Sequence, residues 1–215
     1  MYAAVVTSFD SPPSYWEFPT PTPQDANEVL VEVVASGLHR RVRSQADGSH
    51  YTSTDELPLV PGVDGVGRLP DGTLRYFALG DTTAGAMADQ TVIDLRQSFV
   101  LPDGTDPVLV AAAMNPAMSS WVALRRRIDF QTGQPVLVLG ATGSSGQLAV
   151  QVAKRLGAGR VIAAGRNPQR LAELPALVDE IASGALRIDA RAVPLRDVTS
   201  AWQDTGSAER VVLTP

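Results

Sequence analysis

The chain contains no cysteine among its 215 residues. This absence excludes disulfide bonds, thiolate zinc sites and a cysteine nucleophile, and with them a disulfide-dependent secreted fold. Basic residues are also in the minority, because 18 Lys and Arg stand against 23 Asp and Glu and the net charge is -5. Such a chain has no general attraction to phosphate backbones or anionic lipid, so we expect no nucleic-acid partner and no membrane partner.

Targeting signals and long apolar runs are missing as well. The N-terminal residues 1–19 contain no basic region followed by an apolar run, and we find no stretch near the roughly 20 apolar residues of a membrane span. These absences predict a cytoplasmic protein. Hydrophobic residues make up 44% of the chain, which is enough for a core, and its length is long for one domain and short for two full ones. We expect two compact units.

The first hundred residues have the pattern of short strands interrupted by proline and glycine. Residues 28–37 place Val29, Val31 and Val33 on one face with Glu32 opposite, which predicts a half-buried strand. Residues 56–73 contain three prolines and four glycines among apolar residues, a composition that favours a small irregular β-barrel.

Residues 106–130 change to helical spacing. We interpret this segment as a helical connection between the two units, which Pro116 breaks or kinks. From Val136 the pattern becomes strand, glycine turn, helix and strand. The apolar run 136–139 is typical of a parallel strand that is buried on both faces, and Leu148, Val152 and Leu156 form a helical stripe that ends at Gly157.

Asn167 is a suitable N-cap residue, with Pro168 at the first helical position. The apolar series in residues 167–184 runs through Pro175, so it fits either two short helices or one kinked helix. Residues 186–193 alternate as a strand with one wet face, 194–202 have helical spacing, and 209–215 form a last strand.

Gly140, Gly143 and Gly146 have the spacing G-x-x-G-x-x-G between the buried strand and the amphipathic helix. At such a turn, missing side chains let backbone N–H groups reach a pyrophosphate at the positive end of a helix. The alternative is that the glycines only permit a tight turn and close packing. The predicted cofactor-binding residues of this turn are Gly140, Thr142, Gly143, Ser144, Ser145 and Gly146.

The end of the second strand indicates which dinucleotide is bound. An acidic residue there bonds the ribose hydroxyls of NAD, whereas arginine accommodates the extra phosphate of NADP. The sequence AAGRNPQR has no carboxylate and carries Arg166 and Arg170. These residues favour NADP, and the alternative is that both arginines only solvate the start of a helix.

Several segments together resemble a known family. They are EVLVEVVASGLHRR, PLVPGVDGVG, the long run from AMSSW to KRLGA, and LVDEIASGALRIDARAVPL. In this order they are similar to the medium-chain dehydrogenases and reductases, in particular the zinc-independent branch that resembles quinone oxidoreductases. The resemblance implies an α/β chain in which a GroES-like β-barrel catalytic domain joins a Rossmann unit, and it implies the reduction of quinones or activated enones by NADPH.

The resemblance also implies the catalytic residues. Ser119 matches the position that contacts the nicotinamide carboxamide, His39 lines the same pocket, and Tyr51 is the nearest phenol in sequence. Imidazole suits a general acid because its ordinary pKa of about 6.5 lies near working pH, although a structural histidine is an equal alternative. The zinc-ligand positions of relatives correspond to Leu38 with His39 and to Val63 with Asp64, so we expect no metal site, even when His50 is added.

The chain departs from the family in length. A Rossmann domain has two βαβαβ halves, whereas only one strand-helix-strand unit precedes the segment that returns to the catalytic domain. We interpret this as an internal deletion, natural or engineered, with segments 1–115, 116–174 and 175–215. A sheet cut to its first strands exposes apolar faces and edges, which predicts a homo-oligomer, including by exchange of segments. The alternative function is a non-catalytic structural or nucleotide-binding remnant. A further explanation is that the polypeptide has residues that this sequence omits, which an intact mass near 22.7 kDa would exclude.

Overall fold

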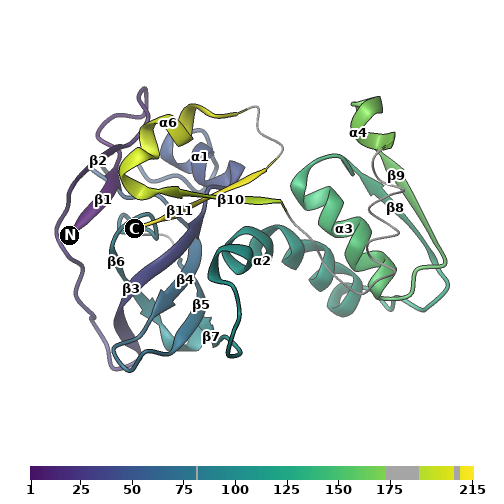
Figure 1. Ribbon diagram of the computed structural model, residues 1–215, viewed down its shortest axis with the longest axis horizontal. Coiled ribbons are helices and arrows are strands. Elements are labelled where there is room, and N and C mark those ends of the chain that lie inside the picture. The colour runs from purple at the N-terminus through teal and green to yellow at the C-terminus, as the bar shows by residue number, and fades with distance from the viewer. Residues whose placement is uncertain (81, 173–188, 206–208) are drawn as a thin grey trace. The chain divides into compact units, whose positions relative to one another are not determined.

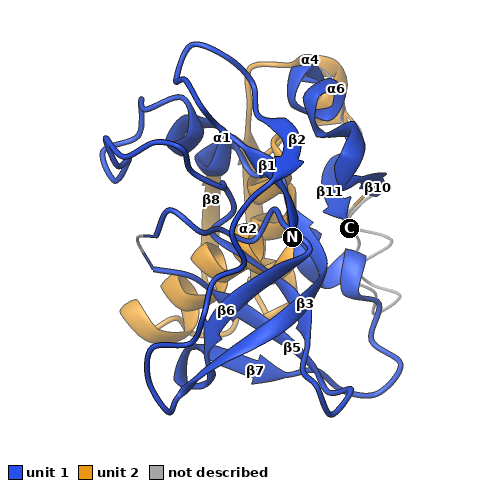
Figure 2. Cartoon of the chain, turned by 90° about the vertical axis from the view of Figure 1, so that its left-hand side faces the viewer, with its two compact units in different colours: residues 1–112, 190–215 blue, residues 113–189 orange. Residues whose placement is uncertain are grey.

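The structure is a computed structural model that describes residues 1–80, 82–172, 189–205 and 209–215 (Figure 1). The chain divides into two compact units, which Figure 2 shows in blue and orange. Unit 1 contains Met1–Ala112 and Ala190–Pro215, and unit 2 contains Ala113–Asp189. The boundaries that the sequence suggests, after residues 115 and 174, differ from these, and the second lies outside the described residues.

Unit 1 is built on a seven-stranded sheet with the order β10-β11-β3-β4-β5-β7, in which β6 pairs with β3 beside this path. Its strands are β3 (Glu28–Gly37), β4 (Asp64–Arg68), β5 (Leu74–Ala78), β6 (Gln90–Asp94), β7 (Ser98–Val100), β10 (Ala190–Pro194) and β11 (Arg210–Thr214). Strands β1 (Tyr2–Val5) and β2 (Ser14–Glu17) form a separate antiparallel pair. The described pairings leave β7 and β10 as ends, so the expected barrel is here a sheet without a closed ring.

Strand β3 confirms the predicted strand and organises the unit. Val31 and Val33 are buried and Glu32 is exposed, as the alternation requires. The first half of β3 pairs with β6, and its second half pairs with β4 and then with the C-terminal strand β11. The end of β3 therefore lies between a strand of the N-terminal segment and a strand from the far end of the chain.

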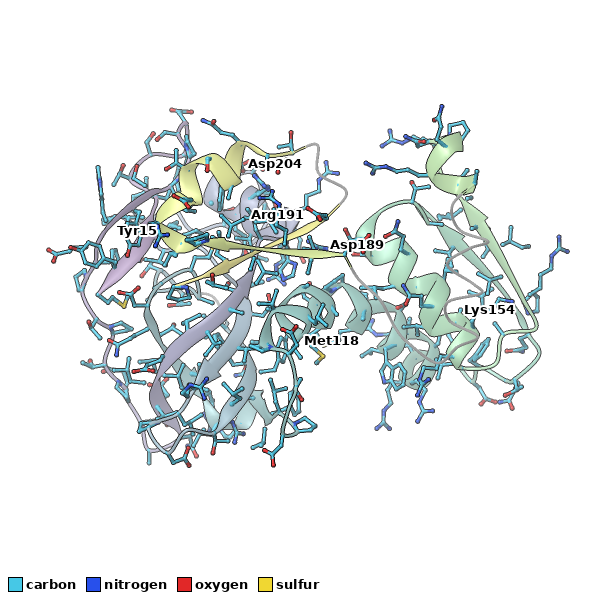
Figure 3. All side chains as sticks on the ribbon, in the orientation of Figure 1. Tyr15, Met118, Lys154, Asp189, Arg191 and Asp204 are labelled. Atoms are coloured by element: carbon cyan, nitrogen blue, oxygen red, sulfur yellow. The ribbon has the colours of Figure 1, made fainter. Side chains whose placement is uncertain are left out.

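The C-terminal segment is part of the core of unit 1. After β10 come the short helix η3 (Leu195–Asp197) and helix α6 (Val198–Gln203). The residues of this segment that pack into the largest buried cluster, together with Ala3, Ala4 and Met87, are Val193, Leu195, Val198, Ala201, Val211 and Leu213. Figure 3 labels Arg191 and Asp204 of the same segment, whose Nη2 and Oδ2 atoms lie 2.6 Å apart.

Arg43 ties the C-terminal segment to helix α1 (Arg40–Ala46). Its guanidinium donates hydrogen bonds to the backbone oxygens of Ala201 and Asp204, both at 3.1 Å, and to that of Trp202, whose ring it also covers. These acceptors include the carbonyls at the end of α6, which have no partner within the helix. Burial lowers the pKa of Arg43, and the charge of Asp204 opposes that shift.

Helix α2 (Pro107–Val122) continues through Pro116, so of the two predicted alternatives, a break or a kink, the break does not occur. It is followed by η2 (Ala123–Arg127), which has π-helical geometry. By length and composition Pro107–Arg127 is apolar enough to cross a membrane, so our statement that no stretch approaches span length was wrong. Pro116 and the serines interrupt the apolar run, which is why the sequence did not suggest a membrane span. One such helix is weak evidence for a membrane span, because core helices have the same composition. The boundary between the units falls within α2.

Unit 2 contains the predicted strand, turn, helix and strand. Strands β8 (Pro135–Leu139) and β9 (Arg160–Ala164) pair in parallel, and α3 (Ser144–Arg155) connects them. Leu148 and Val152 of the predicted stripe are buried, and Gly157 follows the helix with φ of +87°, as a C-terminal glycine does. Helix α4 (Pro168–Ala172) starts as predicted, because Asn167 Oδ1 accepts a hydrogen bond of 3.0 Å from the Arg170 amide. The rest of the predicted segment 167–184 and residues 186–188 lie outside the described residues.

The expectation that β8 is buried on both faces is wrong. Only Val138 is buried, whereas Leu137 and Leu139 are 57% and 76% exposed, and Ile162, which pairs with Leu137, is 42% exposed. Helix α3 covers one face of the strand pair, and no described element of unit 2 covers the other. The exposed apolar face agrees with the consequence we expect of a shortened parallel sheet.

Candidate functional site

Two of the three glycines of the turn after β8 are required by the structure of the turn. Gly140 has φ of +77°, a conformation that L-residues avoid, and its N–H donates to the oxygen of Ala164 at 2.8 Å. At Gly146 a Cβ would lie only 2.1 Å from the Gly140 oxygen, so this glycine permits close packing of α3 on the turn. Gly140 and Gly146 are therefore explained by the fold itself.

Neither backbone conformation nor packing requires a glycine at position 143. Its φ of -87° and ψ of 160° are ordinary for any residue, and a Cβ there would meet only the Gly140 oxygen at 3.6 Å. It is exposed and is the N-cap residue of α3, without a side-chain capping bond. A side chain is absent where the protein leaves room for one, which is the arrangement expected where a ligand approaches the backbone.

The start of α3 offers donors to such a ligand. The first backbone N–H groups of a helix have no acceptor within it, and α3 begins with Ser144, Ser145 and Gly146. The partial positive charge at this end favours an anion. The residues present at this turn thus fit the pyrophosphate of a dinucleotide. Thr142 lies at the neighbouring turn after β9, because a Cβ at Gly165 would stand 2.8 Å from its Cγ2.

Arg166 and Arg170 follow β9, as the sequence places them. Arg166 is exposed and Arg170 is partly buried, and neither guanidinium forms an ion pair with a described residue. No Asp or Glu occurs in residues 165–172. Within the described residues, both cations therefore lie near the end of β9 without a carboxylate partner.

The predicted catalytic residues are distributed over both units. Ser119 is exposed on α2 in unit 2, whereas His39 and Tyr51 belong to unit 1. Tyr51 is 92% exposed, and its ring contact is with His50 at 4.4 Å. The structure does not bring Tyr51 to His39 in this state, and the catalytic roles of the three residues stay predictions.

His39 is buried in a polar cluster that the sequence did not reveal. It is 4% exposed, and its Nε2 atom lies 2.8 Å from Oδ1 of Asp64, which is 1% exposed. The other carboxylate oxygen accepts a hydrogen bond of 2.8 Å from the hydroxyl of Tyr76. The sequence gives no sign that Asp64 of β4 and Tyr76 of β5 contact each other. Asp64 in an apolar turn was the only hint, and we weighed it only as a metal ligand.

Burial and the charge of Asp64 shift the pKa values of the two side chains Tyr76 and Arg210. Burial raises the pKa of Tyr76 well above its usual range, and the charge of Asp64 and the hydrogen bond to it act in the same direction. Burial lowers the pKa of Arg210 on β11, and the charge of Asp64 opposes this. Tyr76 is therefore a permanent hydrogen-bond donor at neutral pH.

The described residues contain no group of three potential metal ligands. His50 is not part of the cluster, since its Nδ1 atom contacts the hydroxyl of Thr52 at 2.9 Å. Unit 1 also contains a cavity of about 390 Å³, whose lining includes Thr52, Ser53, Thr54, Leu59 and Val60. None of the predicted catalytic residues lines it.

Comparisons with known proteins show which sequences and folds this chain is similar to. The probable NADPH-dependent quinone reductase tdiC of Emericella nidulans is 34% identical over 86% of this chain and 60% of its own length. The quinone oxidoreductase of Thermus thermophilus, solved alone and with NADPH, superposes with a TM-score of 0.81 at 21% identity over all of both chains. The chain is similar in sequence to the quinone-oxidoreductase-like branch of the medium-chain dehydrogenases and reductases, and its fold is that of a solved quinone oxidoreductase.

Other relatives agree with this family. The chloroplastic NADPH-dependent alkenal/one oxidoreductase of Arabidopsis thaliana is 26% identical over 67% of this chain and 42% of its own length. A scan against models of known protein families found no match. The chain therefore spans about 60% of tdiC and less than half of the Arabidopsis enzyme, as expected of a shortened member of the family.

Proposed function

We propose that this chain binds NADPH at the turn between β8 and α3 and uses it, without zinc, to reduce a quinone or an activated enone. Gly143 carries the proposal, because neither its backbone dihedral angles nor a close contact requires a glycine at that position. A glycine that only permits a turn would show a left-handed φ or a close contact, as Gly140 and Gly146 do. The relatives named as NADPH-dependent reductases support the same function.

The residues of the chain have distinct roles in this proposal. The amides of Ser144 and Ser145 hold the pyrophosphate, and Gly143 lets it approach the backbone. Arg166 and Arg170 hold the 2′-phosphate that distinguishes NADPH from NADH. Ser119 orients the carboxamide of the nicotinamide. When bound, the cofactor supplies a hydride. His39 supplies the proton that completes the reduction, and Tyr51 is the second candidate for that role.

A non-catalytic nucleotide-binding protein is the second candidate function. It is favoured by the two-stranded sheet of unit 2, because a complete Rossmann domain binds the dinucleotide across two halves. Calorimetric titration with NADPH and NADH, in parallel with a quinone reduction assay, separates the two. Binding with turnover supports the reductase, binding without turnover supports the second candidate, and the absence of binding refutes both.

We also propose that the chain self-associates. The exposed face formed by Leu137, Leu139 and Ile162 is apolar, and parallel sheets in proteins are normally covered on both faces. A second copy of the chain offers an identical face and strand edge. Light scattering at micromolar concentration tests this, and a monomer would refute it.

A further inference from the structure

A single buried carboxylate is shared by His39 and Tyr76. Asp64 accepts from the Tyr76 hydroxyl with Oδ2 and contacts Nε2 of His39 with Oδ1, both at 2.8 Å. We propose that Asp64 is a positioning residue, which keeps the proton of neutral His39 on Nε2 and leaves Nδ1 as the nitrogen that takes up and releases a proton. The role of that proton in catalysis rests on the proposed reductase function.

Tyr76 donates to one of the two oxygens of Asp64. Its raised pKa keeps the hydroxyl protonated, so one oxygen of Asp64 must be an acceptor. An ionised carboxylate only accepts, and therefore Nε2 of His39 has to be the donor. The alternative, a protonated Asp64 that donates to Nε2, would move the imidazole proton to Nδ1.

Packing holds the ring of His39 beside the carboxylate of Asp64. The same carboxylate lies near Arg210 of strand β11, because its charge raises the pKa of Arg210 against the larger effect of burial. Gly37 makes room for the ring, because a Cβ there would lie 2.7 Å from Cε1 of His39. The ring is thus held against the carboxylate by packing as well as by the hydrogen bond.

Nδ1 of His39 is buried and has no hydrogen-bond partner in the described residues, and the same is true of Nε of Arg210. Leaving a buried nitrogen unpaired costs about 1–3 kcal/mol, and such atoms occur where a group acts in catalysis. This cost is explained if Nδ1 of His39 forms its hydrogen bond with the substrate when the substrate is bound.

The chemical step balances with this assignment. When bound, the cofactor would supply a hydride to the quinone, and the product of that transfer would be a hydroquinone anion. His39 in its imidazolium form would give its Nδ1 proton to the anion oxygen, and the neutral ring would be protonated again from solvent. Asp64 pairs with the imidazolium in the same way that an aspartate orients and stabilises the histidine of a hydrolase triad.

The protonation state is measurable without any activity. The sequence contains only two histidines, so imidazole nitrogen-proton correlation spectra of the full chain show two rings, and His50→Gln assigns them. His50 is a built-in reference, because the backbone N–H of Thr52 lies 3.2 Å from its Nδ1 and donates to it when the proton of the ring is on Nε2. We expect the Nε2–H form for His39 as well. A dominant Nδ1–H form of His39 would overturn the proposal.

Two variants test the positioning. In Asp64→Asn the amide can present either an oxygen or an NH₂ group to Nε2, so we expect both ring forms of His39, whereas Tyr76→Phe keeps Asp64 and retains the Nε2–H form. His39 in a single Nε2–H form in Asp64→Asn would contradict the assignment. Tyr76→Phe also serves as the second variant where Asp64→Asn does not fold, and a shift of its His39 to Nδ1–H would overturn the proposal.

Kinetics distinguish positioning from a merely structural role. Asp64→Asn should lower kcat for quinone reduction about 100-fold, as loss of a general acid does, with KM for NADPH within about twofold. His50→Gln should leave kcat unchanged. A lower melting temperature with unchanged kcat would show a structural role only. A parent chain without turnover would refute the proposed function alone, since the spectra still decide the position of the proton.

Discussion

Replacing Gly143 by alanine separates a ligand-binding glycine from a structural one. The added Cβ meets no protein atom closer than 3.6 Å, and the backbone dihedral angles suit alanine. Loss of a favourable N-cap residue costs about 1 kcal/mol, and the restricted unfolded chain returns about 0.4–1 kcal/mol. The free energy of unfolding should therefore change by less than about 1 kcal/mol.

The same methyl group should weaken NADPH binding strongly. It stands where we expect the pyrophosphate to approach the backbone, and one lost hydrogen bond to a charged group is worth about 2 kcal/mol. This corresponds to a roughly 30-fold higher Kd. Calorimetry measures the affinity and urea unfolding measures the stability of the same preparation.

Three further variants complete the experiment. Gly143→Ser restores an N-cap side chain and should bind NADPH as weakly as the alanine variant. Lys154→Ala at the far end of α3 is the matched control and should leave the affinity unchanged. Gly146→Ala should destabilise unit 2, because its Cβ would lie 2.1 Å from the Gly140 oxygen. A Gly143→Ala protein that binds NADPH like the parent would refute the reasoning.

Three other predictions follow from the described contacts. The double variant Arg166→Ala, Arg170→Ala should raise the Kd for NADPH roughly tenfold or more and leave the Kd for NADH unchanged, as measured by calorimetry. An equal loss of affinity for both nucleotides would show that the two arginines do not bind the 2′-phosphate. Arg43→Met removes hydrogen bonds to α6 and should cost ~2 kcal/mol in urea unfolding, whereas the exposed Arg41→Met should cost little. Leu139→Asp should convert a self-associated chain into monomers by light scattering, and an unchanged mass would place the contact elsewhere.

Local patterns predicted the local structure well. The alternation around Val31 predicted strand β3, and the glycine turn predicted the start of α3, because dihedral preferences and burial periodicity act over a few residues. The exposure of Leu139 depends on which strands and helices lie beside it, so an apolar run alone could not show that one face is bare. The contact of His39 with Asp64 joins residues 25 positions apart, and no periodicity carries that information.

Titration of the full chain with NADPH and with NADH, at equal salt, is the most direct test of the central claim that the β8–α3 turn is a dinucleotide site. The account predicts micromolar binding of NADPH and much weaker binding of NADH, with the NADPH affinity lost in Gly143→Ala. Absence of binding by either nucleotide would contradict it, and the three glycines would then be only a turn between a strand and a helix.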